Sequence, residues 1–175
     1  MPINRHTGDQ GSTGVLGGKR VSKSDLIVEV LGSIDEANAV LGVARSTCRA
    51  SESGEIILHI QQHLWKLMAD VASAMSSPEH QGREIGAEHI RWLEEKIEHL
   101  SSLVTVPDGF LVPGDSYPAA VLDLARTVVR RAERRLVAFA QEGLHNPFVL
   151  QYLNRLSSLC YMLELQELNW ISGND

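Results

Sequence analysis

A cluster of arginines near the C-terminal end is the feature of this sequence best suited to chemistry. The ten residues from Arg126 to Arg135 contain five arginines, in a chain whose formal net charge is -6. If the segment forms an α-helix, one edge carries four charged side chains within about 100° of one another. These are Arg126, Arg130, Glu133 and Arg134. Such a cationic strip could bind an anion, with Glu133 either orienting an arginine or accepting a bond from the ligand.

The spacing of these arginines by itself favours a second interpretation, an ion-paired surface helix, because runs of charge usually form solvated faces. Arg131 and Arg135 point away from the strip, and we expect them to be solvated. The apolar stripe beside the strip is formed by Leu122, Val129, Ala132, Leu136 and Ala140.

The N-terminal segment 1–24 has the composition of a phosphate-binding arm. Its glycines would let the backbone approach a ligand closely, its hydroxyls would donate hydrogen bonds, and Lys23 would neutralise charge. It is not a P-loop, because Thr13 stands where the first glycine is needed and Arg20 replaces the required Ser or Thr. A terminus without fixed structure has the same composition and is the alternative.

Length and composition restrict the class of protein. A chain of 175 residues with 43% hydrophobic residues predicts a single domain over 1–175, an arm at 1–24 and a helical bundle at 25–171. The acidic balance and a pI near 5.6 argue against a nucleic-acid or anionic-membrane partner. Cys48 and Cys160 are predicted to be unpaired thiols. With no signal-like or spanning apolar run, the prediction is a cytoplasmic protein.

Helical periodicity of apolar residues predicts five helices and no strands. The expected helices cover about 25–49, from Ser53 to before Pro78, 84–103, from Asp115 or Ser116 to Gly143, and onward from Asn146 and Pro147. Short connections between amphipathic helices are typical of an antiparallel bundle, so the fold class is all-α.

Two further features have alternative interpretations. Phe110 lies in a turn-rich loop of residues 106–114 and is either a plug for the bundle end or a side chain offered to a ligand. His59 and His63 share a helix face, but the glutamate that follows the first histidine in zinc peptidases is missing, so we predict no metal site of protein ligands alone.

Taken in order, seven segments resemble the PduO-type cobalamin adenosyltransferases, nearly from end to end. The segments are Thr7-Gly-Asp-Gln-Gly-Ser-Thr-Gly14, Arg20-Val-Ser-Lys23, Gly32-Ser-Ile-Asp-Glu-Ala-Asn38, Phe110-Leu-Val-Pro-Gly114, Ala125-Arg-Thr127, Arg130-Arg-Ala-Glu-Arg134 and Tyr152-Leu-Asn-Arg-Leu-Ser157. The resemblance implies a five-helix bundle that assembles as a homotrimer with sites between subunits.

The resemblance also implies roles for individual residues. The ATP-binding set would be Arg5, His6, Thr7, Gly8, Thr13, Gly14, Lys23, Arg130, Arg131, Ala132, Glu133, Arg134 and Asn154. Asp35 and Arg126 match a pair that bridges neighbouring subunits. Phe110 matches the aromatic residue on the lower face of the corrin, and Arg130 and Phe110 would be the catalytic residues.

The activity implied is transfer of the 5′-deoxyadenosyl group of ATP to Co(I) of reduced cobalamin, with Mg²⁺ on the phosphates. Because Co(I) is itself a strong nucleophile, the protein needs only to orient ATP and stabilise the leaving triphosphate. A flavin-type reductase and a B12-dependent mutase are the implied partners. The alternative function is a trimeric protein that binds ATP or adenosylcobalamin as a sensor or carrier, without catalysis.

Four positions depart from the family pattern. Asp115 replaces a second glycine, Asp123 stands where histidine is frequent, Ser158 replaces an aspartate, and Glu164 falls near a usual arginine. These departures gather on the side expected to bind cobalamin and at the expected subunit contact. The nucleotide side keeps the family residue types.

Overall fold

The computed structural model describes residues 8–16, 18–74, 83–141, 143–144 and 146–172. Within them lie five long helices and one small hairpin, in the order β1 (Ser12–Gly14), β2 (Arg20–Ser22), α1 (Leu26–Thr47), α2 (Ser53–Ser73), α3 (Ala87–Ser101), α4 (Tyr117–Ala140) and α5 (Pro147–Ser172). None of these helices is long and apolar enough to cross a membrane. Arg5, His6 and Thr7 fall outside the described residues.

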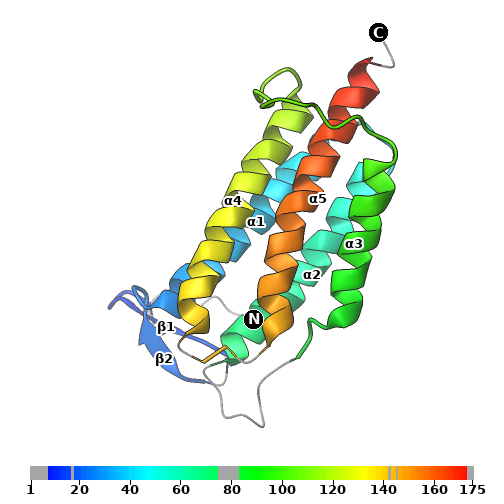
Figure 1. The fold of residues 1–175 in the computed structure, drawn as a ribbon. Coiled ribbons are helices and arrows are strands. Elements are labelled where there is room, and N and C mark those ends of the chain that lie inside the picture. Colours follow the sequence, from blue (N-terminus) through cyan, green and yellow to red (C-terminus); the bar gives the residue numbers. More distant parts are fainter. Residues whose placement is uncertain (1–7, 17, 75–82, 142, 145, 173–175) are drawn as a thin grey trace.

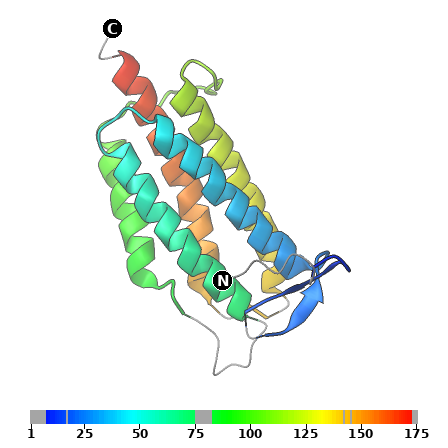
Figure 2. The same cartoon turned by 180° about the vertical axis from the view of Figure 1, so that it is seen from behind.

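The helices form a bundle in which α4 packs between α1 and α5, while α5 also contacts α3 and α1 also contacts α2. Figure 1 shows α4, α5 and α3 along one side and α1 and α2 behind them, and Figure 2 shows the same arrangement from the back. Each helix contributes fully buried aliphatic side chains to one continuous core, among them Ile34, Leu64, Leu93, Leu122 and Leu156. The predicted all-α bundle is confirmed.

The helix ends follow the local chemistry of the sequence. Ser116 precedes α4 with an extended backbone, and Pro118 lies in the first turn, where a missing N–H costs nothing. Asn146 accepts a hydrogen bond from Phe148 N at 3.0 Å through its side-chain oxygen and so caps α5. Gly143 has a φ of 132°, a conformation that suits glycine in the turn between α4 and α5.

The hairpin corrects the prediction that the chain has no strands. Thr13 pairs with Val21 in an antiparallel ladder, and the Val21 side chain is buried. Each strand has only three residues, which is too short to show a period-two pattern of apolar residues. The hairpin is reinforced by Arg20, whose Nη2 donates to Ser12 Oγ at 2.6 Å. Part of the arm is therefore an ordered element next to the start of α1 (Figures 1 and 2).

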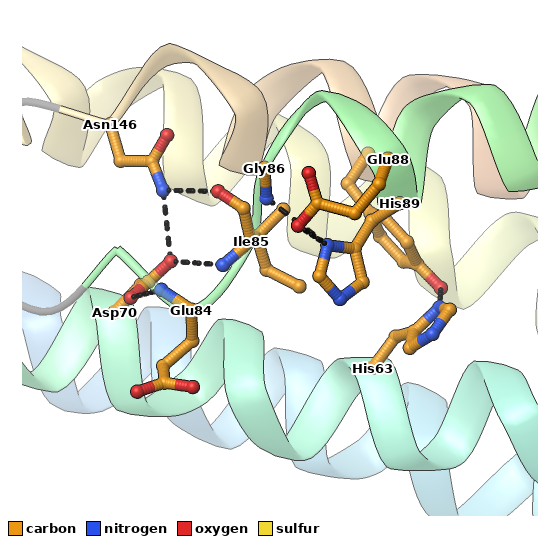
Figure 3. Close-up of polar contacts among 9 residues, drawn as sticks. His63, Asp70, Glu84, Ile85, Gly86, Glu88, His89 and Asn146 are labelled. Atoms are coloured by element: carbon orange, nitrogen blue, oxygen red, sulfur yellow. Dashed lines mark hydrogen bonds and ion pairs between the residues drawn. The ribbon is translucent and has the colours of Figure 1, made fainter.

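One buried carboxyl group ties three segments together at the end of the bundle where α2 finishes. Asp70 accepts hydrogen bonds from Glu84 N at 2.8 Å and Ile85 N at 3.0 Å. It also accepts one from Asn146 Nδ2 at 2.9 Å, and the same amide group donates to Ile85 O at 2.8 Å (Figure 3). Asp70 thus joins α2, the start of the α3 segment and the start of α5.

Glu167 plays a similar part near the other end of the bundle. Its carboxyl oxygens accept hydrogen bonds from Arg49 N at 2.9 Å and Ala50 N at 3.1 Å, which anchors the turn between α1 and α2 to α5. The nearby Cys48 is a free thiol, as is the buried Cys160, so the prediction of unpaired cysteines is confirmed. Burial, followed by the charge of Glu167, raises the pKa of Cys48 to about 12.

We expect Asp70→Ala to lower the free energy of unfolding by about 3 kcal/mol or more, because three donors, two of them buried, would lose their acceptor. Chemical denaturation at neutral pH measures the effect. Asp108→Ala, which removes an exposed carboxyl group from the loop before α4, is the matched control and should change stability by less than about 0.5 kcal/mol. Equal effects of the two substitutions would contradict the anchoring role of Asp70.

Candidate functional site

The arginines of α4 divide into paired and unpaired members. Arg131 forms an ion pair with Glu36 of α1, and Arg135 Nη2 lies 3.1 Å from Glu29 Oε1 of the same helix. Both arginine side chains are solvated as expected, with 42% and 47% of their surface exposed, but each is also ion-paired, because α1 supplies carboxylates at matching heights along the α1–α4 contact. Arg131, which the resemblance placed at the nucleotide, faces α1.

Arg126 is also paired, within its own helix. Its Nε and Nη2 donate to Asp123 Oδ1 at 2.9 and 2.6 Å. The expected partner from the resemblance, Asp35, is exposed on α1 and does not take part in this pair. The Asp35–Arg126 bridge between subunits stays a prediction.

Arg130 and Arg134 are the two arginines of this segment that form no ion pair with another described residue, and both are exposed. Beside them, Asn154 Nδ2 of α5 donates to Glu133 Oε1 at 3.0 Å. The structure thus brings together Glu133 and Asn154, two residues that lie 21 positions apart in the sequence. Glu133 is already engaged as an acceptor, while the two guanidinium groups remain available to an anion.

Arg155 extends this polar edge toward α3. Its Nη1 lies 3.3 Å from Asn154 Oδ1, and its Nε lies 3.2 Å from Glu94 Oε1. The Asn154 amide is consequently held on both sides, by Glu133 and by Arg155. Arg155 was not singled out by the sequence analysis, although it lies within one of the family-like segments.

The described part of the arm folds Lys23 back onto its glycines. Lys23 N donates to Gly11 O at 2.8 Å, and a Cβ built on Gly8 would lie 3.2 Å from Lys23 Nζ. Any side chain at position 8 would therefore crowd the ammonium group. Gly8 and Lys23 form a compact cationic turn, which is suited to an anion but lacks the strand–loop–helix arrangement of a P-loop.

The hairpin also lines a surface pocket of about 670 Å³ that the sequence analysis did not anticipate. Thr13 and Gly14 form one wall, α1 contributes Asp35, and α2 contributes Trp65, whose side chain is 72% exposed. An exposed tryptophan on the outer face of a predicted amphipathic helix was the available signal. Thr13 and Gly14 thus face α1 and α2, whereas Arg130 and Arg134 lie on the α4–α5 side of the bundle. The pocket lining does not include Arg130 or Arg134.

A second cavity, of about 310 Å³, lies beneath the loop that carries Phe110. The Phe110 side chain is 90% exposed, so the interpretation of Phe110 as a plug for the bundle end is wrong. The floor of the cavity is formed by Asp123 and Arg126 of α4 and by Tyr161 and Glu164 of α5. The sequence analysis had marked Asp123 and Glu164 as departures from the family pattern and expected such departures on the cobalamin side, but it did not predict that these two residues line one cavity.

Glu164 is the most perturbed carboxyl group of this cavity. The residue is 2% exposed, and its Oε2 is buried without a hydrogen-bond partner among the described residues. Burial raises the pKa of Glu164 from 4.5 to about 7, the nearby Asp123 carboxylate also raises it, and Arg126 opposes them. The Glu164 side chain is therefore partly protonated at neutral pH.

A histidine cluster lies apart from both cavities, between α2, α3 and α5. His63 Nδ1 is 3.1 Å from the Tyr152 hydroxyl, and the rings of His63 and His89 pack edge to face at 4.6 Å (Figure 3). Burial, together with the charges of neighbouring basic groups, lowers the pKa of His63 to about 4. In the described chain, no group of three or more His, Cys, Asp or Glu residues could hold a metal ion.

Comparison with known proteins places the chain in a family. A model described as cobalamin adenosyltransferase matches residues 3–167, so the chain belongs to the cobalamin adenosyltransferase family. The corrinoid adenosyltransferase PduO of Salmonella typhimurium is 37% identical over 167 residues, which are 95% of this chain and 50% of that protein. The corrinoid adenosyltransferase of Bacillus subtilis is 36% identical over 161 residues, covering 90% of this chain and 81% of that protein.

Solved structures agree with this assignment. A variant PduO-type ATP:corrinoid adenosyltransferase from Lactobacillus reuteri, complexed with cobalamin and ATP, superposes with a TM-score of 0.88 at 30% identity, covering 98% of this chain and 92% of that one. Another variant of the L. reuteri enzyme, complexed with ATP, gives the same TM-score and identity. The chain spans half the length of the PduO relatives from Salmonella and Citrobacter freundii. The predicted family resemblance is confirmed.

The raised pKa of Glu164 should make the stability of the protein depend on pH. Between pH 4.5 and 7 the folded state binds more protons at Glu164 than the unfolded state, so this group lowers stability as pH rises, and the penalty is complete above about pH 7. Glu164→Gln removes the titration. We compare the free energy of unfolding of the variant with that of the unsubstituted protein at each pH. This difference should be roughly 2 to 3 kcal/mol more in favour of the variant at pH 8 than at pH 5.

Denaturant unfolding of both proteins at the two pH values measures this difference. His63 titrates in the same range with the opposite sign, because its lowered pKa makes stability fall as pH drops below 6.5. Its contribution is common to both proteins and cancels in the comparison. A difference that does not change with pH would show that Glu164 does not titrate as described.

Proposed function

We propose that the chain transfers the 5′-deoxyadenosyl group of ATP to the Co(I) centre of reduced cobalamin or a related corrinoid. The observation that carries this proposal is the pair of unpaired guanidinium groups, Arg130 and Arg134, beside the Glu133–Asn154 contact on the α4–α5 edge. Membership of the family and the likeness to L. reuteri structures complexed with cobalamin and ATP support the choice of substrates. In this reaction the cobalt–carbon bond forms with two electrons from Co(I), the C5′–O bond of ATP breaks, and triphosphate leaves with that electron pair.

The residues of the chain would act by positioning and by charge. Arg130 and Arg134 bind the triphosphate and stabilise the negative charge that accumulates as it leaves. Arg131 and Ala132 belong to the same helical turn, and the buried Ala132 packs this turn against the core. Asn154, held by Glu133, orients the nucleotide. The reaction abstracts no proton, so no general base is needed.

The arm would complete the nucleotide site from a neighbouring subunit. Gly8, Thr13, Gly14 and Lys23, together with Arg5, His6 and Thr7, supply backbone amides, hydroxyls and cations to the phosphates. The proposed assembly is a homotrimer, in which Asp35 of one copy could reach Arg126 of the next; within one protomer the pocket lined by Thr13 and Gly14 does not include Arg130. Mg²⁺ would be coordinated by phosphate oxygens, because the described residues offer no acidic cluster for it.

The corrinoid would bind above the second cavity. The exposed ring of Phe110 offers an apolar surface to one face of the corrin and excludes an axial ligand from the cobalt there. A cobalt without that ligand is reduced to Co(I) more easily. We place the protein in the cytoplasm, where a flavin-type reductase would supply the electron and a B12-dependent mutase would accept the product.

A second function is favoured by one observation, the two carboxyl groups Asp123 and Glu164 on the corrinoid side. If they impair transfer, the protein would bind ATP or adenosylcobalamin as a sensor or carrier. Incubation with chemically reduced cobalamin, ATP and Mg²⁺ separates the two functions. Formation of adenosylcobalamin, seen by its absorbance spectrum, together with triphosphate supports the transferase, whereas tight ATP binding without alkylation supports the carrier.

We expect Arg130→Ala to abolish saturation by ATP in the accessible range, since loss of a cation that contacts phosphate costs about 2 kcal/mol or more, roughly a 30-fold loss of affinity. Initial rates against ATP concentration measure it. Arg135→Ala is the matched control: it removes an arginine of the same helix that is paired with Glu29, and ATP kinetics should not change. Normal ATP kinetics in the Arg130 variant would refute the nucleotide site.

We expect Phe110→Ala to lower kcat for adenosylation at least about tenfold while leaving KM for ATP unchanged, because only the corrinoid surface loses its ring. Val112→Ala changes another exposed apolar residue of the same loop and serves as the control. If both variants transfer the adenosyl group at the unsubstituted rate, Phe110 has no part in the reaction.

A further inference from the structure

Glu164, which lines the cavity beneath the Phe110 loop, has a buried carboxyl oxygen without a hydrogen-bond partner in the described part of the chain. The residue is 2% exposed, and the atom without a partner is its Oε2. A buried carboxyl oxygen without a donor is unfavourable, because it has lost water and gained nothing in return. A hydrogen-bond donor brought by a ligand in the cavity would remove this penalty.

The nearest cation does not fill this role. Arg126 directs both its Nε and its Nη2 to Asp123 Oδ1, at 2.9 and 2.6 Å. Asp123 therefore takes the arginine that would otherwise satisfy Glu164. The cavity lining then holds two carboxyl groups and one guanidinium group, so it carries no surplus positive charge with which to attract an anion.

The size and polarity of the cavity restrict its occupant. A volume of about 310 Å³ is at the lower end of the range for small-ligand pockets, so it suits a substituent of a large molecule better than the whole molecule. A neutral primary amide brings two N–H donors and no charge. Corrinoids carry such amides on short arms around the ring, next to the face that Phe110 would cover.

We propose that Glu164 determines substrate specificity by accepting a hydrogen bond from a peripheral amide of the corrinoid and by rejecting corrinoids that carry a carboxylate at that position. The proposal rests on the corrinoid binding put forward above. Asp123 supports it as a positioning residue, because it holds Arg126 away from Glu164. Replacement of the amide by a carboxylate would set two acidic groups against each other in a buried space, where repulsion is strong.

The ionisable groups that face Glu164 are Asp123 and Arg126 of α4 and Cys160 and Tyr161 of α5. The pKa of Cys160 is raised to about 12, so that thiol stays neutral. Below about pH 7 a protonated Glu164 can itself donate to a carboxylate, and above it the group only accepts. Rejection of acid-bearing corrinoids should therefore strengthen from pH 6 to pH 8.

The test compares equilibrium binding of cobalamin with that of its separated monocarboxylic acids, in which one peripheral amide has been hydrolysed. Binding is followed through the corrinoid absorbance at pH 6 and pH 8. For the unsubstituted protein at pH 8 we expect at least one acid to bind at least about tenfold more weakly than cobalamin. The measured quantity is the ratio of the dissociation constant of the acid to that of cobalamin. Glu164→Gln should reduce this ratio about tenfold, because the glutamine amide can donate to the carboxylate.

Two further variants make the outcome decisive. Glu164→Leu should bring the ratio close to one, since it removes both the acceptor and the repulsion. Glu95→Gln, on the exposed face of α3, is the matched control and should leave the ratio unchanged. Circular dichroism establishes that each variant is folded.

Two results would overturn the proposal: no binding of cobalamin by the unsubstituted protein, or an unchanged ratio in both Glu164 variants, whether their oligomeric state stays the same or changes. An unchanged ratio with a changed oligomeric state would assign the missing donor to a neighbouring subunit. Failure of the proposed function can be told apart from failure of this proposal. A protein that binds cobalamin but forms no adenosylcobalamin is not a transferase, yet its binding ratios still decide the role of Glu164.

Discussion

Charge pairing along α4 is the interaction on which the proposed chemistry depends. Carboxylates of α1 neutralise Arg131 and Arg135, and these pairs lie along the contact that joins α1 to α4. Exposed pairs of this kind contribute at most about 1 kcal/mol each to stability. Their more important effect is selective, because pairing on one side of α4 leaves Arg130 and Arg134 as the guanidinium groups open to a polyanion. A single helix can thus serve both the fold and a ligand, since its successive arginines point in different directions.

The corrinoid side has an excess of carboxyl groups over guanidinium groups, the opposite of the nucleotide edge. At the nucleotide edge two guanidinium groups, those of Arg130 and Arg134, accompany one carboxylate, Glu133, whose Oε1 accepts a hydrogen bond from Asn154. Beneath Phe110 there are two carboxyl groups for one guanidinium group, that of Arg126. The first arrangement favours a highly charged phosphate chain, and the second favours a neutral donor. Both arrangements use side chains of α4 and α5, and α5 is held by buried polar anchors near both ends of the bundle, through Asp70 and Glu167. This rigidity matters because transfer requires the reacting atoms to be aligned closely.

Prediction from the sequence succeeded for the helices because each buries one face, and an apolar period of 3.6 residues records that burial directly. It failed for β1 and β2, since three-residue strands leave no periodic pattern and are held by backbone pairing and by the Arg20–Ser12 contact. For the candidate site, residue types and order were enough to select the arginine strip and Asn154. They could not tell which arginines were already paired, because Glu29 and Glu36 lie about a hundred residues earlier in the chain.

By itself, the sequence determined the all-α class, the helix boundaries to within a few residues, the family and the cationic character of one helix edge, since these depend on local periodicity and on the order of short motifs. Only the tertiary structure decided that Asn154 meets Glu133, that Asp123 holds Arg126, and that Glu164 is buried without a donor. The reason is physical. Pairing and burial depend on which side chains from distant segments come within a few ångströms, and that is set by how the helices pack.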